Sequence, residues 1–215
     1  MAVVRVWHPI EDLPEGLGTY RPRELDVLVP VWEESRQDLA QSEALAEFHQ
    51  RLARQWAMET GILERLYTVD PGTTQLLVEQ GFDASLVAHG STDLPPERLV
   101  EFLQAHRDAL EGLFEFVKSD VPLTTSYIRE LHVALTRAQE EAEAVDALGR
   151  IVRVPILKGE YRRLPNNPVR GDGTVYLYCP PEQVAEEMER LVRMHREHVR
   201  DGVEAAVRAA WLHHR

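Results

Sequence analysis

Apolar residues recur three or four positions apart along most of this chain, the spacing that places them on one face of an α-helix. The longest such pattern covers residues 32–63, with no glycine or proline before Gly61, and it predicts one long helix. A second apolar stripe predicts a helix over residues 95–118, capped by Ser91 or Asp93. Further helices are predicted over residues 73–80, 124–145, 181–199 and 203–215.

Two stretches break this helical pattern. Residues 1–31 are short apolar runs interrupted by prolines and glycines, which predicts an irregular arm packed on the body. Residues 150–178 alternate in polarity and contain β-branched residues around Asn, Pro and Gly. This second stretch predicts a β-hairpin with the segment RGDG, residues 170–173, at or near its turn. The expected fold is therefore mainly α, with one exposed β-hairpin.

The composition is that of an acidic globular protein. Hydrophobic residues make up 44% of the chain and charged residues 28%, which is compatible with a real core. The formal net charge of -12 argues against duplex nucleic acid and against anionic membranes as partners. A single cysteine, Cys179, fits a reducing cytosol, and no apolar run reaches the roughly 20 residues of a membrane-spanning helix. We therefore expect a cytoplasmic protein.

The residue patterns contain no complete catalytic motif. Neither a phosphate-binding GxxxxGK[ST] loop nor an HExxH zinc motif is present. His195 and His198 lie three residues apart, and His213 and His214 are adjacent. Structural zinc usually requires four ligands, often cysteines, so surface histidines are favoured over a metal site. No histidine partner is indicated for Cys179, so an inert thiol is favoured, and we assign no catalytic residue and no metal ligand.

The predicted hairpin suggests binding. It carries Lys158, Arg162, Arg163 and Arg170 in an otherwise acidic protein. An exposed strand edge can accept an extended peptide through its free backbone groups. The hairpin could equally be a decorative insertion, and the spacing of its residues leaves both interpretations open.

Four segments, in order, resemble the Fic (Fido) domain family: SYIRELHVAL at 126–135, GEYRR at 159–163, YLYCPPEQVAEEMERL at 176–191 and AAWLHHR at 209–215. Family members have a helix with an LH pair, a G-x-Y/W-R element, a β-hairpin flap, and a proline pair that opens the next helix. The resemblance implies a helical bundle with one β-hairpin flap and an N-terminal helical arm. Residues 1–94 would be the arm with an inhibitory helix, and residues 95–215 an incomplete Fic domain.

Fic proteins typically transfer AMP from ATP to a hydroxyl side chain of a target protein. Their signature HPFx(D/E)GNGRxxR supplies the general base, an acidic ligand for Mg²⁺ and the phosphate-binding turn. The signature is absent from these residues and would begin just beyond Arg215, so neither His213 nor His214 is given the catalytic role. The resemblance therefore implies ATP and Mg²⁺ for the family, with this chain inactive by itself. Without the central helix, we expect exposed apolar surface around Trp211 and around the helix over residues 95–118, and self-association to form a homo-oligomer stays open.

The segment TGILER, residues 60–65, resembles the inhibitory pattern (S/T)xxxE(G/N) of many Fic proteins. Thr60 and Glu64 occupy the two defining positions. In the family this glutamate pairs with an arginine of the signature and competes with a phosphate for it. Arg65 stands where the family has Gly or Asn, so we expect it to pair with Glu64 or to shift the helix end.

The resemblance also places target binding on the flap, between about Lys158 and Cys179. A target protein would add a strand there, and Lys158, Val175, Tyr176 and Leu177 are the candidate contacts. The alternative function is a non-catalytic target-binding or regulatory module that uses the same flap. A helical scaffold with a chance resemblance is the third hypothesis.

Overall fold

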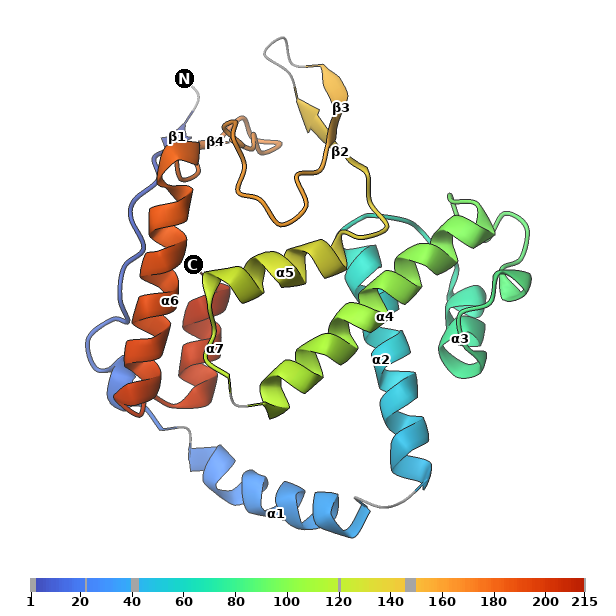
Figure 1. Ribbon diagram of the computed structural model, residues 1–215, viewed down its shortest axis with the longest axis horizontal. Coiled ribbons are helices and arrows are strands. Elements are labelled where there is room, and N and C mark those ends of the chain that lie inside the picture. The colour runs from blue at the N-terminus through green and yellow to red at the C-terminus, as the bar shows by residue number, and fades with distance from the viewer. Residues whose placement is uncertain (1–2, 22, 40–42, 120, 146–149, 215) are drawn as a thin grey trace. The chain divides into compact units, whose positions relative to one another are not determined.

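The computed structural model describes residues 3–21, 23–39, 43–119, 121–145 and 150–214 (Figure 1). These residues are mainly α-helical, as the sequence predicts. The helices are α1 (Arg23–Leu39), α2 (Glu43–Leu63), α3 (Pro71–Gln80), α4 (Pro96–Lys118), α5 (Thr125–Leu135), α6 (Val184–Arg200) and α7 (Ala205–His213). The strands are β1 (Val4–Arg5), β2 (Glu141–Val145), β3 (Ile151–Pro155) and β4 (Val175–Tyr176), and short 3-10 turns cover Leu17–Thr19, Ala84–Leu86 and Pro181–Gln183.

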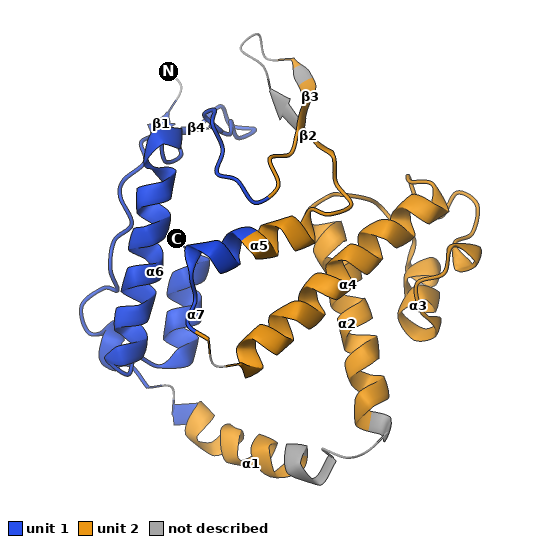
Figure 2. Cartoon of the chain, viewed as in Figure 1, with its two compact units in different colours: residues 1–24, 122–129, 159–215 blue, residues 25–121, 130–158 orange. Residues whose placement is uncertain are grey.

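The chain folds as two compact units, each built from separate parts of the sequence (Figure 2). The first unit comprises Met1–Glu24, Pro122–Arg129 and Gly159–Arg215, and the second comprises Leu25–Val121 and Glu130–Lys158. The division of the chain after residue 94 stays a prediction. Helices α2 and α4, which come from either side of residue 94, nevertheless pack against each other in the second unit.

Two expected helices have different bounds. The arm predicted as irregular over residues 1–31 becomes helical at Arg23, and α1 contains Pro30 in its interior. A proline there removes one backbone hydrogen bond and usually ends a helix, which is why the sequence favoured a start near residue 32. The junction of α1 and α2 at residues 40–42 lies outside the described part. The helix expected over residues 124–145 ends at Leu135, because residues 141–145 form β2 instead.

Helix ends are set by local hydrogen bonds. Asp70 caps α3, because its Oδ1 accepts from the N–H groups of Gly72 at 2.8 Å and Thr73 at 3.1 Å. Gly81 follows the last residue of α3, as the sequence predicts. The expected cap of α4 by Asp93 is wrong: its Oδ1 accepts from the Thr68 N–H at 2.7 Å, and α4 starts behind Pro95 without a side-chain cap.

The described strands form two small pairs. Strands β2 and β3 form an antiparallel hairpin in which Ala142 is opposite Val154. This hairpin was not predicted at residues 141–145. The predicted turn at residues 170–173 is confirmed, since the Gly173 N–H donates to the Arg170 carbonyl at 2.9 Å and Gly173 has a φ of 83°.

Each unit has its own hydrophobic core. In the second unit the buried core cluster comes from α2, α3, α4 and the segments between them: Met58, Tyr67, Leu77, Val87, Leu99, Phe102 and Leu103. In the first unit, Leu191 and Met194 of α6 pack on Trp211 of α7. Trp211 is only 5% exposed, so the expectation of exposed apolar surface is wrong around this residue, whereas Phe114 and Val117 of α4 are 39% and 69% exposed. Ile10 and Leu13 of the N-terminal arm complete this core, which sequence periodicity could not show.

Candidate functional site

Helix α2 ends in a Schellman motif at the segment that resembles the inhibitory pattern. The Leu66 N–H donates to the Gly61 carbonyl at 2.9 Å, and the Arg65 N–H donates to the Ile62 carbonyl at 3.1 Å. Arg65 has a φ of 57°, in the left-handed region that favours glycine or asparagine. The helix therefore ends where the sequence places it, and among the described residues Arg65 forms no ion pair with Glu64.

We expect Arg65→Gly to raise the free energy of unfolding by about 0.5–1 kcal/mol. The left-handed conformation costs a residue with a Cβ atom about 1–2 kcal/mol, and the added freedom of glycine in the unfolded chain offsets part of the gain. Arg65→Ala is the matched control, because alanine keeps the Cβ atom. Urea unfolding measures both variants, and an equal gain for alanine would show that removal of the guanidinium, not of the Cβ atom, is responsible.

Gly61 and Tyr67 fix the geometry of this helix end. Tyr67 is 2% exposed, and its hydroxyl lies 3.3 Å from the carbonyl oxygens of both Ala57 and Met58 on α2. The phenol packs so closely on Gly61 that a Cβ atom there would lie 2.2 Å from the Tyr67 hydroxyl oxygen. Burial raises the pKa of Tyr67 above its ordinary value, so the phenol stays protonated as a hydrogen-bond donor.

Glu64 lies at a pocket of about 620 Å³ within the second unit. The Glu64 side chain is exposed and forms no hydrogen bond or ion pair with any described residue. Thr60 is half-buried, and its carbonyl accepts a hydrogen bond from the Glu64 N–H at 2.9 Å. The pocket is lined by the segment that follows α2, by residues in and just before α4, and by residues in and just before the β2–β3 hairpin: Glu64, Arg65, Leu66, Leu94, Arg98, Phe102, Gln139, Glu140, Glu141, Ala142 and Arg153. Three carboxylates and three guanidinium groups thus surround one cavity.

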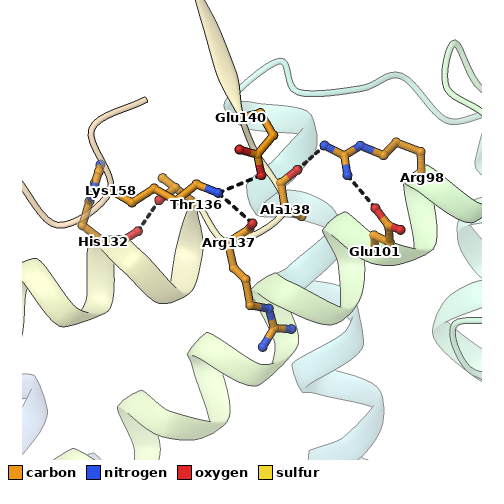
Figure 3. Close-up of polar contacts among 8 residues, drawn as sticks. All are labelled: Arg98, Glu101, His132, Thr136, Arg137, Ala138, Glu140 and Lys158. Carbon is orange, nitrogen blue, oxygen red and sulfur yellow. Dashed lines mark hydrogen bonds and ion pairs between the residues drawn. The ribbon is translucent and has the colours of Figure 1, made fainter. Parts of the chain in front are cut away.

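Arg98 lines this pocket, and contacts with three residues hold its guanidinium in place. Its guanidinium bonds to Glu101 at 2.5 Å and to the Ala138 carbonyl (Figure 3), and it stacks on Phe102 with its carbon 5.0 Å from the ring centroid. Sequence reasoning did not single out Arg98 or Arg153. Neither belongs to a local motif, because the fold brings them to Glu64 from α4 and β3.

Lys158, a predicted target contact, has a structural role. Its ammonium donates to the Glu140 carboxylate and to the Arg137 carbonyl, both at 3.0 Å (Figure 3). Arg137 follows the end of α5, where exposed carbonyls favour a cation. These contacts tie the start of the flap to the start of β2. Lys158 and Glu64 belong to the second unit, whereas Val175, Tyr176 and Leu177 belong to the first.

His106 of α4 is buried against the C-terminal half of α2. It is 3% exposed, and its Nδ1 lies 3.3 Å from the Ala57 carbonyl oxygen. Because a carbonyl oxygen only accepts hydrogen bonds, Nδ1 carries the proton and donates it. Burial lowers the pKa of His106, and the negative charge of Glu64 offsets part of this shift. His106 is therefore more readily protonated in the unfolded chain than in the folded one.

This difference predicts a loss of stability in acid. As the pH falls through about 6.5, the ordinary value for histidine, the unfolded chain gains a proton that folded His106 does not bind, so unfolding becomes easier. We expect the urea midpoint of the wild type to fall more between pH 7.5 and pH 5.5 than that of His106→Gln, which keeps an N–H donor. Equal pH dependence of the two proteins would contradict this assignment.

The flap edge predicted at Val175, Tyr176 and Leu177 is not free. Strand β4 pairs in parallel with β1, with Val4 opposite Val175 and Arg5 opposite Tyr176 (Figure 1). The side chains of all three flap residues are half-buried. The expectation of an exposed edge is therefore wrong, while the role of these residues as target contacts or as a clamp stays a prediction. The edge could not be predicted as covered, because parallel pairing with residues about 170 positions earlier leaves no local signal in the sequence.

The segments that resemble the Fic family contact one another within the first unit. The Arg129 side chain of α5 donates to the Gly159 carbonyl at 2.6 Å, and its guanidinium carbon lies 5.8 Å from the centre of the Tyr161 ring. Thr125 donates to Glu189 of α6 at 2.7 Å. Arg162 donates to the Cys179 carbonyl, so the segment at 159–163 contacts the proline-pair segment as well.

Among the other candidates for chemistry, His213 and His214 are exposed as expected, whereas the expectation of a surface histidine is wrong for His198. His198 is buried and bonds through Nε2 to Asp12 at 2.6 Å, which lowers the pKa of that carboxyl. Burial raises the pKa of Cys179, which favours the protonated, unreactive thiol. The described residues contain no group of three or more His, Cys, Asp or Glu side chains placed to hold a metal ion. Nor does any helix among them have the length and apolar character needed to cross a membrane.

Comparisons with known proteins return no match to this chain among protein-family models, curated proteins or solved structures.

Proposed function

We propose that this chain carries the regulatory and target-binding parts of a Fic-type protein AMP-transferase. The observation that supports this most is the placement of Glu64. The Schellman motif ends α2 at this residue. The Glu64 side chain is exposed to solvent and has no hydrogen-bond or ion-pair partner among the described residues. A carboxylate held in this way is suited to pair with an arginine and to compete with a phosphate group for it.

The cap also gives a physical reason for the inhibitory pattern. The position after Glu64 adopts a left-handed conformation, which explains why a pattern of this type prefers Gly or Asn there. Arg65 keeps that geometry at some cost in stability. Arg65 in place of Gly or Asn therefore makes the end of α2 less stable, but Glu64 keeps its position at that helix end.

ATP and Mg²⁺ are implied by the resemblance, but the described residues do not fit them. The pocket at Glu64 offers as many carboxylates as guanidinium groups, so it is not suited to a triphosphate. The sequence lacks the HPFx(D/E)GNGR signature that would supply a base and a metal ligand. We derive no catalytic step from this chain. Its proposed contribution is to restrain transfer through Glu64 and to bind the target through the flap.

The test uses labelled ATP. The proposal requires the signature to be encoded next to these residues in the gene. The protein made from the whole gene should then label itself or a target in the presence of Mg²⁺ and α-labelled ATP, and the 215-residue chain should not. Labelling by the 215-residue chain alone, or a gene without the signature, would overturn the proposal.

The alternative, a non-catalytic target-binding module, is favoured by one observation. Strand β4 already holds an extended partner strand, β1, through backbone bonds. A gene that lacks the signature would leave strand binding as the activity of this chain.

A further inference from the structure

One edge of β4 is paired with β1 of the same chain. The Val175 N–H donates to the Val3 carbonyl at 2.9 Å, and the Leu177 N–H donates to the Arg5 carbonyl at 2.8 Å. The intervening N–H, of Tyr176, points the other way and donates to the Pro168 carbonyl at 3.0 Å. Val175 also forms an antiparallel bridge with Val169. Strand β4 thus has backbone partners on both sides, an isolated bridge on one side and β1 on the other.

Strand β1 is attached by its backbone and hardly by its side chains. Val3, Val4 and Val6 are 56%, 52% and 62% exposed, so little apolar area is buried when this segment pairs. A strand of two residues held by a few backbone hydrogen bonds is weakly bound, because each such bond replaces a bond to water. Backbone pairing also places few demands on sequence, so another extended segment can take the same position.

The arm that follows β1 is anchored separately. The Ile10 N–H donates to Glu187 at 2.7 Å, Asp12 bonds to His198 at 2.6 Å, and the Trp211 indole donates to the Glu11 carbonyl at 3.1 Å. Residues 10–13 therefore have contacts with α6 and α7 that do not depend on the pairing of β1 with β4. This tether keeps β1 at a high effective concentration near its site, so a competitor must bind better than a free copy of β1 would.

We propose that Val3–Arg5 occupies in cis the strand site that a target protein uses, so that an extended target segment binds the flap by displacing β1. The partner is an extended, β-branched segment that runs parallel to β4. The identity of this partner as the substrate of AMP transfer rests on the proposed function, whereas the exchange of strands does not. The N-terminal strand then restrains target binding at the flap, whereas Glu64 restrains transfer.

Amide hydrogen exchange followed by NMR tests this proposal. A variant that lacks residues 2–6 should exchange the amide protons of Val175 and Leu177 at least about fivefold faster than the wild type, while Tyr176 keeps its protection. A peptide of residues 3–9, VVRVWHP, added to this variant should restore the protection of both amides. The same peptide should bind the wild type more weakly, because β1 already fills the site.

Two controls keep the test specific. A peptide with proline in place of Arg5 cannot donate to the ladder and should not restore protection. His8→Pro lies outside β1, before Pro9, and should leave the exchange of Val175 and Leu177 unchanged. Unchanged exchange in the shortened variant, equal loss of protection at Tyr176, or failure of the VVRVWHP peptide to bind would overturn the proposal. No nucleotide is involved, so failure of AMP transfer would leave this result intact.

Discussion

Gly61→Ala is expected to lower the free energy of unfolding of the second unit by about 3 kcal/mol. The new Cβ atom would lie 2.2 Å from the Tyr67 hydroxyl oxygen and 2.3 Å from its Cζ atom. The phenol cannot move aside easily, because it is 2% exposed and packs edge-on against Phe102 at a centroid distance of 6.2 Å. The substitution therefore forces either the Tyr67 ring out of the core or the end of α2 out of its cap.

Gly112→Ala in α4 is the matched control. A Cβ atom there meets nothing within 4 Å, and alanine is a better helix former than glycine. This variant should gain about 0.5–1 kcal/mol, opposite in sign to Gly61→Ala. Urea unfolding followed by far-ultraviolet circular dichroism compares the two. A gain in both variants would mean that Tyr67 does not pack on Gly61 as described.

Trp211→Ala should destabilise the first unit by about 3–5 kcal/mol, the usual cost of truncating a buried aromatic residue. The indole packs edge-on against His198, with centroids 4.7 Å apart, and it also donates a hydrogen bond to the Glu11 carbonyl. Its loss would uncover Leu191 and Met194 and free the N-terminal arm. Because the core of this unit is small, few other residues can fill the space.

Trp56→Ala is the control for this substitution. Trp56 of α2 is 38% exposed and contacts Phe114 at a centroid distance of 5.9 Å, so its truncation should cost about 1.5 kcal/mol or less. The chain has two units, so hydrogen exchange of the amides in α6 and α7 measures the first unit more directly than a whole-chain melting curve. Equal loss of protection in α6 and α7 in both variants would contradict the separate core around Trp211.

The sequence predicts those helices whose ends carry local chemistry. The bounds of α3 follow from Asp70 and Gly81, and α6 follows from the proline pair before it. The first part of α1, from Arg23 to Pro30, was missed because Pro30 suggested a break where the helix in fact continues. Strand β2 was missed because its Glu and Ala residues favour a helix, and only pairing with the β-branched residues of β3 decides its conformation.

Only the part of the candidate site that is formed by residues close together in the sequence was predictable. Thr60, Glu64 and Arg65 form one motif at one helix end, so the sequence alone could identify them. The pocket around Glu64 required Arg98 and Arg153, which only the folded chain brings to it. The pairing of β4 in the flap with β1 in the N-terminal arm could likewise not be predicted. The one signal for it was the β-branched run Val3, Val4 and Val6, which by itself predicts an extended segment but no partner.

The most direct test of the account measures AMP transfer by the protein made from the whole gene, with Glu64 and with Glu64→Gln. If Glu64 restrains transfer through a charge-assisted bond, the Glu64→Gln protein should transfer at least about tenfold more label. Glu59→Gln is the control, because Glu59 lies on the same helix, accepts from Gln55 at 2.8 Å and does not line the pocket; it should match the wild type. Equal transfer by the wild type and Glu64→Gln would contradict a regulatory role for this helix end.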